Sequence, residues 1–156
     1  MNSSLTPVAV ALLYQPGCFL MQLRDDLPTI LYPGHWAFFG GHLEPGETPV
    51  EGLKRELWEE IRYTLSHDPY KFGCYSDQRV IRHVFAIPLT VPLTDLQLCE
   101  GQDWGLLSVA DIERGTCFSA KANSVRPIST LHRQILLDFI VDLRTGQNTP
   151  QIPKKF

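Results

Sequence analysis

The sequence has little excess charge, no long hydrophobic run and no basic segment at its N-terminus. The formal net charge is −3 over 156 residues, which excludes the strongly basic surface typical of proteins that bind duplex nucleic acid. No apolar stretch approaches the length of a membrane span, and the first residues lack the pattern of a secretory signal. We therefore expect a soluble, cytoplasmic protein with neither a membrane nor a duplex nucleic-acid partner.

The sequence also lacks paired cysteines, internal repeats and low-complexity linkers. Its four cysteines are scattered and form no Cys-x-x-Cys pair, which argues against a zinc site or a disulfide framework and favours free thiols. A chain of this length can bury a hydrophobic core without such cross-links. We expect a single domain over residues 1–156, with a polar C-terminal tail at about residues 147–156.

A helix is predicted to begin at Thr48 in the most informative segment, residues 41–63. Thr48 can cap the free backbone N–H groups, Pro49 suits the first helical position, and Glu51 can complete a capping box. Four apolar residues then recur at helical spacing and predict one buried stripe. They are Val50, Leu53, Leu57 and Ile61.

Three carboxylates lie on a neighbouring ridge of this predicted helix. Glu56, Glu59 and Glu60 occupy positions i, i+3 and i+4, which are neighbours on a helix surface. Because like charges this close repel one another, a cation has to offset them. Mg²⁺ prefers oxygen ligands and often works with substrate phosphates, so the ridge is a candidate metal site.

The segment before the helix has the residues of a loop that could approach a ligand. Gly40 and Gly41 permit close backbone approach and unusual conformations, and residues 44–47 read as a turn. Arg55 and Glu47 fall on a third side of the helix, where they could pair and brace this loop. The order of loop, helix and carboxylates predicts a holder for metal-bound phosphates.

This segment resembles the signature of the Nudix hydrolases, Gly-x5-Glu-x7-Arg-Glu-(apolar)-x-Glu-Glu-x-Gly-(apolar). The glycine near the end of the signature is replaced by Arg62. That glycine would end the helix in a left-handed conformation, so Arg62 either adopts it at a cost of about 1 kcal/mol or lets the helix run further. The matching positions are Gly41, Glu47, Arg55, Glu56, Leu57, Glu59, Glu60 and Tyr63.

The resemblance implies an α/β fold, an α/β/α sandwich with a mixed β-sheet between helices. It also implies a MutT-like, Mg²⁺-dependent hydrolase in which Mn²⁺ could substitute for Mg²⁺. Such an enzyme cleaves the pyrophosphate linkage of a nucleoside diphosphate joined to another moiety, as in nucleoside triphosphates, nucleotide sugars or ADP-ribose. The alternative is a non-catalytic nucleotide sensor on the same fold, which would more often have a damaged carboxylate cluster. A homodimer is a further expectation from the family.

The resemblance assigns roles to the residues of the segment. Glu56 and Glu60 would be direct metal ligands, Glu59 a ligand or the base that activates water, and the Gly40 carbonyl a further ligand oxygen. Glu59, Glu60 and Arg55 would form the catalytic group of this helix.

Further candidates lie elsewhere in the chain. Glu100 precedes a tryptophan in a segment similar to one that completes the metal site or supplies the base in some family members, and Asp103 is its rival. The expected substrate contacts are a strand-end arginine, a loop glycine, an aromatic residue that could instead pack in the core, and an asparagine before the last helix. These are Arg24, Gly41, Trp36 and Asn123.

Apolar patterns predict the remaining elements. Strands are expected at residues 7–14, 18–24, 35–39, 78–89, 96–100 and 104–107, with another beginning at 63–65. Loops are expected at 25–34 and 117–127, and a short helix or turn at 109–112. A second amphipathic helix is expected over 128–143, with Gly146 as its stop.

Overall fold

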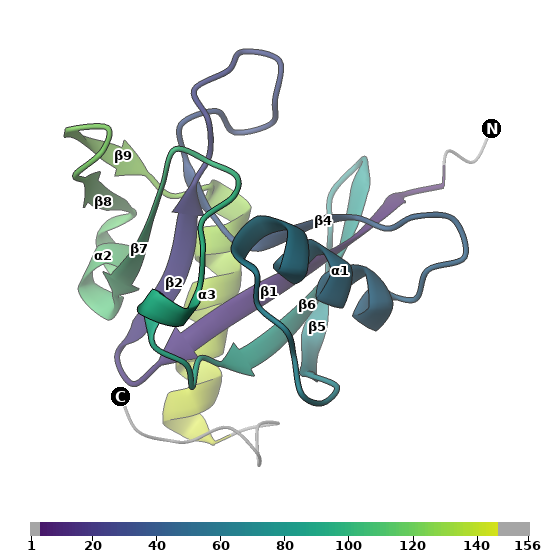
Figure 1. Ribbon diagram of the computed structural model, residues 1–156. Helices are drawn as coiled ribbons and strands as arrows, with labels where there is room; N and C mark the ends of the chain where they lie inside the picture. The colour runs from purple at the N-terminus through teal and green to yellow at the C-terminus, as the bar shows by residue number, and fades with distance from the viewer. Residues whose placement is uncertain (1–3, 147–156) are drawn as a thin grey trace. The chain divides into compact units, whose positions relative to one another are not determined.

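The computed structural model describes residues 4–146, so the predicted tail at about 147–156 lies outside the described residues. The chain divides into two compact units, and Figure 1 labels their elements. Within the described residues, the first unit contains residues 4–12, 39–87 and 91–99. The second contains residues 13–38, 88–90 and 100–146. The single domain expected over residues 1–156 stays a prediction.

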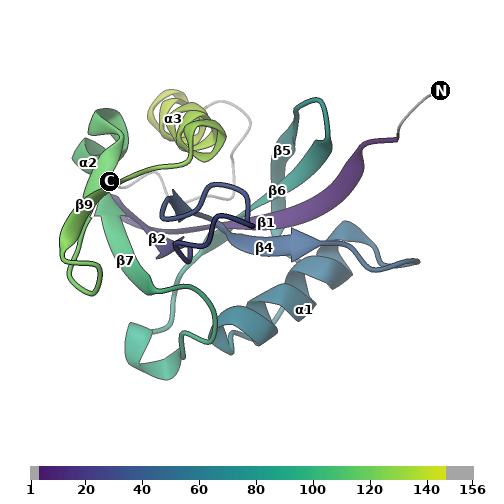
Figure 2. The same ribbon diagram turned by 90° about the horizontal axis from the view of Figure 1, so that it is seen from above.

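The first unit is built on strands that neighbour the first part of β1 (Thr6–Gln15). Strand β4 (Phe39–His42) pairs antiparallel with β1, while β6 (Val80–Pro88) lies next to β1 and pairs with β5 (Tyr70–Ser76). Helix α1 (Pro49–Ile61) runs alongside β4 (Figure 2). The short 3-10 helix η1 (Leu93–Asp95) completes the unit.

Helix α1 begins as the sequence predicts. The Thr48 side chain accepts from the Glu51 N–H, the Glu51 side chain accepts from the Thr48 N–H, and Pro49 occupies the first turn. The predicted apolar stripe is buried at three of its four positions, Leu53, Leu57 and Ile61, while Val50 is half-buried. Each fully buried side chain contributes about 1.5–3 kcal/mol relative to exposure, which fixes the face that α1 turns to the core.

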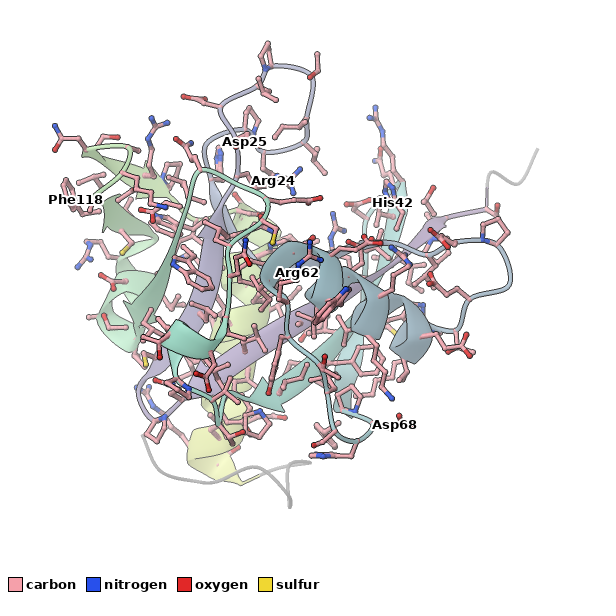
Figure 3. All side chains as sticks on the ribbon, in the orientation of Figure 1. Arg24, Asp25, His42, Arg62, Asp68 and Phe118 are labelled. Atoms are coloured by element: carbon pink, nitrogen blue, oxygen red, sulfur yellow. The ribbon has the colours of Figure 1, made fainter. Side chains whose placement is uncertain are left out.

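The helix ends at Arg62 in the left-handed conformation that the signature glycine would adopt. Arg62 has φ 55° and ψ 36°, and its N–H donates to the carbonyl of Trp58 at 3.0 Å. Its guanidinium lies 5.2 Å from the centre of the Trp58 ring (Figure 3 labels Arg62), a cation–π distance. Of the two alternatives, the strained helix end is therefore the one found.

Among the described residues, the second unit contains the end of β1 together with five further strands and two helices. Strand β2 (Cys18–Leu23) pairs antiparallel with β1, with β3 (Trp36–Ala37) and with β7 (Asp103–Ser108). Strands β8 (Thr116–Ser119) and β9 (Ser124–Pro127) form a separate hairpin, and the helices are α2 (Val109–Arg114) and α3 (Thr130–Thr145). The ring of Phe139 on α3 packs against Tyr14 and Phe19.

Two expectations near the candidate site are wrong. Gly40 and Gly41 were expected in a loop, but they lie in β4 opposite Val10 and Ala9. Residues 96–100 were expected as a strand, but they form none. Instead the Gln97 N–H donates to the Ile61 carbonyl and the Cys99 N–H donates to the Glu60 carbonyl, both at the end of α1. The segment therefore contacts a helix end rather than a strand.

Two further expectations are wrong, and one strand was missed. Residues 63–65 form no strand, and β5 at Tyr70–Ser76 was missed because a register shift between Lys71 and Gly73 breaks its alternation. Residues 117–127, expected as a loop, contain most of the β8–β9 hairpin.

Within residues 4–146, no helix is both long and apolar enough to cross a membrane.

Candidate functional site

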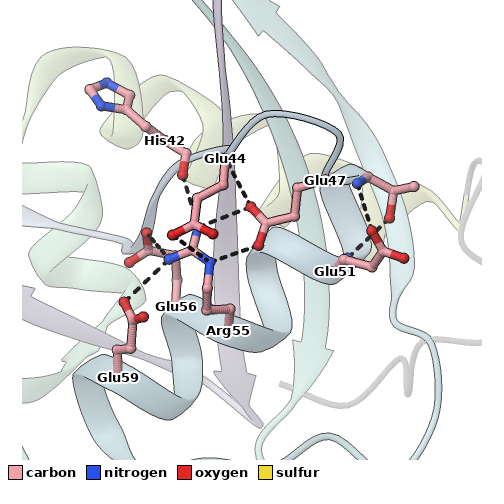
Figure 4. Close-up of polar contacts among 8 residues, drawn as sticks. His42, Glu44, Glu47, Glu51, Arg55, Glu56 and Glu59 are labelled. Carbon is pink, nitrogen blue, oxygen red and sulfur yellow. Dashed lines mark hydrogen bonds and ion pairs between the residues drawn. The ribbon is translucent and has the colours of Figure 1, made fainter.

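The loop between β4 and α1 is held by a two-point ion pair. Arg55 donates to Glu47 from Nε (2.7 Å to Oε1) and from Nη2 (3.0 Å to Oε2), which confirms the predicted pairing. Nη2 also donates to the His42 carbonyl at 3.1 Å, and the Glu44 N–H donates to Glu47 at 2.8 Å. Figure 4 shows these contacts. One guanidinium therefore fixes both ends of the loop to the helix.

The same contacts set the protonation of both partners. The hydrogen bond from Arg55, followed by that from the Glu44 backbone, lowers the pKa of Glu47 to about 2. The hydrogen bond to Glu47 is in turn the largest cause that raises the pKa of Arg55. The Arg55–Glu47 pair, which braces the loop, is thus fully charged at neutral pH.

Arg55 also offsets the repulsion among the carboxylates of α1. Its Nη1 donates to Glu56 Oε1 at 3.0 Å and to Glu59 Oε2 at 3.3 Å (Figure 4). The side chain of Glu56 is 15% exposed and that of Glu59 is 48% exposed. The two carboxylates therefore share one cation but differ in their access to water.

The two glycines of β4, Gly40 and Gly41, lie next to the carboxylates of α1. A Cβ atom on Gly41 would lie 2.6 Å from Glu56 Oε1. Gly40 has φ +138°, and a Cβ there would lie 2.1 Å from the Ala9 carbonyl oxygen. The Gly40 N–H donates to Glu60 Oε2 at 3.1 Å, and Glu60 is only 3% exposed. Gly40 is thus required by the close approach of the Ala9 backbone, while Gly41 leaves the space that the Glu56 carboxylate fills.

The donor atoms suit a hard divalent cation, although the carboxylates are held by other groups in this structure. Among residues 4–146, no three His, Cys, Asp or Glu side chains already surround a common point. Arg55 draws Glu56 and Glu59 to itself, while Gly40 holds Glu60. Carboxylate and carbonyl oxygens are the ligands that Mg²⁺ prefers, and the absence of a Cβ at Gly41 leaves the Glu56 carboxylate open to the strand. The residues fit the cation by chemistry.

The predicted residues of the metal and catalytic group on α1 and β4 all belong to the first unit. Four other candidates, Arg24, Trp36, Glu100 and Asn123, belong to the second unit. Their relation to the carboxylates stays a prediction. His42, at the end of β4, turns its imidazole away from the carboxylates and contributes its carbonyl to the brace (Figure 4). This backbone role was missed because no side-chain pattern marks it.

Two candidates of the second unit, Arg24 and Trp36, have different surroundings. Arg24 follows the end of β2 (Figure 3), and among the described residues its buried Nε atom has no hydrogen-bond partner. Trp36 is 1% exposed, and its Nε1 donates to the Cys117 carbonyl at 3.0 Å. Arg24 therefore has an N–H group to offer a ligand, whereas the Trp36 ring is covered by the core.

The remaining candidates lie at turns. Glu100 is exposed and precedes Gly101, which has φ +83°. Its rival Asp103 is buried and accepts from the Trp104 N–H (2.8 Å) and the Ser119 hydroxyl (2.6 Å). Asn123 has φ +50° in the turn between β8 and β9. Asparagine tolerates this conformation well, so the shape of the turn is enough to explain why an asparagine occupies position 123.

Comparisons with solved structures show the fold. A MutT protein from Methanosarcina mazei matches with a TM-score of 0.67 at 21% identity, over 95% of this chain and 99% of that one. A MutT/nudix family protein from Enterococcus faecalis matches with a TM-score of 0.70 at 12% identity, over 99% of this chain and 67% of that one. The expected α/β fold with a mixed sheet and helices is confirmed.

Comparisons of sequence give the family. A curated relative, the nucleoside triphosphatase NudI of Salmonella arizonae, is 39% identical over 54 residues. That stretch spans 35% of this chain and 38% of the relative's length. The sequence model described as "NUDIX domain" matches residues 4–127, which is most of the chain. The chain therefore belongs to the Nudix family, as the pattern of residues 41–63 predicts.

Proposed function

We propose that this chain is a Mg²⁺-dependent hydrolase that cleaves the pyrophosphate linkage of a nucleoside diphosphate joined to another moiety. Family membership and the name of the NudI relative, a nucleoside triphosphatase, support this class of reaction. Within the class we favour nucleoside triphosphates, with nucleotide sugars and ADP-ribose as the other substrates to test. Mn²⁺ is the expected substitute for Mg²⁺.

The observation that carries the proposal is the contact of β4 glycines with α1 carboxylates. Gly41 leaves space that the Glu56 carboxylate fills, and the Gly40 N–H holds the buried Glu60. Glu56, Glu60, Glu59 and the Gly40 carbonyl would hold Mg²⁺. When bound, the cation would neutralise charge on the pyrophosphate oxygens and on the leaving group.

The exposures of the carboxylates separate their roles. Glu60 is buried and fixed by a backbone N–H, which suits a ligand that must not move. Glu59 is half-exposed and held only at 3.3 Å by Arg55, so it can accept a proton from an attacking water. Glu100, exposed in the second unit, is the alternative base. Arg55 would keep Glu56 and Glu59 in place before the substrate arrives.

The substrate contacts that we propose come from backbone and arginine groups. Gly41 has no side chain of its own, so its backbone would let the metal-bound phosphates approach the strand beside the Glu56 carboxylate. The buried, unpartnered Nε of Arg24 would donate to a phosphate oxygen. Asn123 would contact the base. Trp36 is left out because its ring is 1% exposed.

The proposal is tested by phosphate release with Mg²⁺ across the three substrate classes. Glu60→Gln should lower turnover by at least about a hundredfold, whereas Glu51→Gln should leave it unchanged. Glu51 lies on the same helix, and glutamine also completes a capping box. Near-normal turnover of Glu60→Gln at saturating Mg²⁺ would contradict the assignment. Nucleotide binding without any phosphate release from the wild-type chain would favour the sensor instead.

A further inference from the structure

A second group of reactive side chains lies on the β5–β6 hairpin of the first unit. The Cys74 Sγ atom is 3.5 Å from His83 Nδ1, and the Lys71 Nζ atom is 3.1 Å from the same nitrogen. Cys74 stands directly opposite His83 in the antiparallel pairing. Cys74 and Lys71 are exposed, and His83 is half-buried. A thiol, an imidazole and an ammonium group therefore meet at a solvent-accessible point.

An irregularity in β5 brings Lys71 to this group. Side chains alternate along a regular strand, so residues 71 and 74 would face opposite sides. The register shifts between Lys71 and Gly73, and the extra residue of a bulge reverses the alternation. The burial pattern follows this reversal, since Lys71 and Cys74 are exposed while Phe72 and Tyr75 are half-buried.

Protection of a sheet edge explains part of this arrangement. Strand β5 stands at the end of the strand order, and lysines and bulges on edge strands oppose pairing with other chains. That role accounts for Lys71 and the bulge, but it requires neither a thiol nor an imidazole. The pairing of Cys74 with His83 therefore calls for a chemical explanation.

The other three cysteines have different surroundings. Cys99 is exposed, and its thiol donates to the Gln97 carbonyl at 3.4 Å. Burial raises the pKa of the Cys18 thiol and raises that of Cys117 to about 11, both of which disfavour the thiolate. Cys99 thus serves as an exposed reference thiol for Cys74.

We propose that Cys74 is a modification site for low-molecular-weight disulfides, with Lys71 and His83 as the residues that activate its thiol. Lys71 and Cys74 both contact His83 Nδ1, so a positive charge and an acceptor nitrogen lie near the sulfur that would act as the nucleophile. Burial and the charge of Lys71 lower the pKa of His83, so its ring is neutral at neutral pH. Its Nδ1 atom then has a lone pair that can accept from the Cys74 thiol or from the Lys71 ammonium group.

The reaction is an exchange between a thiol and a disulfide. The Cys74 thiolate attacks one sulfur of the small disulfide, and a new S–S bond forms as the original S–S bond breaks. The second sulfur leaves as a thiolate and takes up a proton from water, which replaces the proton that Cys74 released. The small disulfide is the oxidant, and an excess of thiol reverses the modification.

The test measures the labelling rate of each cysteine in the full chain at neutral pH, by quenched labelling and peptide mass spectrometry. Two reagents are compared, a neutral dipyridyl disulfide and an anionic bis(nitrobenzoate) disulfide. The variants are Lys71→Met, His83→Gln and the charge-retaining Lys71→Arg. Lys54→Met is the matched control, because Lys54 is another lysine of the first unit and pairs with Asp68. Thermal melts verify that each variant is folded.

With both reagents, Cys74 should react at least about threefold faster than Cys99, because an imidazole that can accept the thiol proton and an ammonium group lie beside its sulfur. Lys71→Met and His83→Gln should remove this advantage, while Lys71→Arg and Lys54→Met should retain it. Equal rates for Cys74 and Cys99 would overturn the proposal. So would an advantage that survives Lys71→Met or His83→Gln, or one seen only with the anionic reagent.

Discussion

Arg55 and Glu47 are joined by two hydrogen bonds, of 2.7 and 3.0 Å, across the turn that leads into α1. Two-point contacts between a guanidinium and a carboxylate fix direction as well as distance. The pair therefore holds the loop between β4 and α1 at a defined angle to the helix that bears the carboxylates.

This pair should make stability depend on pH in the acid range. The pKa of Glu47 is lowered from 4.5 to about 2, so the stability it contributes is present above pH 4.5 and is lost as the pH falls toward 2. Glu47→Gln should melt below the wild type at pH 6, and the difference should close by about pH 2. Thermal melts across this range are the measurement. A difference that stays constant would contradict the pairing. The control is Glu51→Gln, because Glu51 is exposed and glutamine can keep its capping contact with the Thr48 N–H.

Alanine substitutions at Gly40 and Gly41 should have different effects, one mainly on stability and the other mainly on turnover. Gly40→Ala should destabilise the chain by at least about 3 kcal/mol, because its Cβ meets the Ala9 backbone at 2.1 Å and its φ is +138°. Gly41→Ala meets only the movable end of Glu56, at 2.6 Å. It should change the unfolding free energy by less than about 1 kcal/mol but lower turnover at least about tenfold. Denaturant unfolding and phosphate release measure the two effects. Full activity in Gly41→Ala would show that the Glu56 position is unimportant.

The end of α1 offers a test of compensating energies. Arg62 in the left-handed conformation costs about 1 kcal/mol, and its contact with the exposed Trp58 ring offsets about 0.5–1 kcal/mol. Arg62→Gly removes both effects and should remain within about 0.5 kcal/mol of the wild type. Arg62→Ala keeps the strain and loses the contact, so it should be less stable by about 0.5–1 kcal/mol. Equal stability of the two variants, measured by denaturant unfolding, would exclude this account.

Divalent cations should stabilise the folded chain through the α1 carboxylates. Mg²⁺ or Mn²⁺ at a hundred times its dissociation constant should add about 2.7 kcal/mol to the unfolding free energy. The rise in melting temperature should disappear in Glu56→Gln and Glu60→Gln, and a chelator should reverse it in the wild type. Glu51→Gln should respond like the wild type. A response that persists without Glu56 and Glu60 would place the cation elsewhere.

Helix α1 could be predicted almost residue by residue because its signals are local. The cap at Thr48, the buried stripe and the Arg55–Glu47 pair depend on spacings within about one turn of a helix or a short loop. The family pattern then supplied roles that spacing alone does not give. The conformation of Arg62 was left with two outcomes, and its contact with Trp58 is also local.

The elements that were missed depend on distant partners. Gly40 and Gly41 become strand because Ala9 and Val10 lie opposite them, which no property of a glycine pair predicts. The β8–β9 hairpin has strands of only four residues each, too short to show clear alternation. Asp103 was considered as a base, yet both of its oxygens bond within the second unit. These outcomes depend on packing between segments far apart in sequence.

The antiparallel pairing of Gly40 with Val10 and of Gly41 with Ala9 also determines which insertions and deletions the protein can accept. A slip of one residue between these strands would put Phe39 or His42 where a glycine now stands, and it would reverse which side chains face inward. Insertions or deletions within either strand should therefore silence the chemistry even when every acidic residue survives.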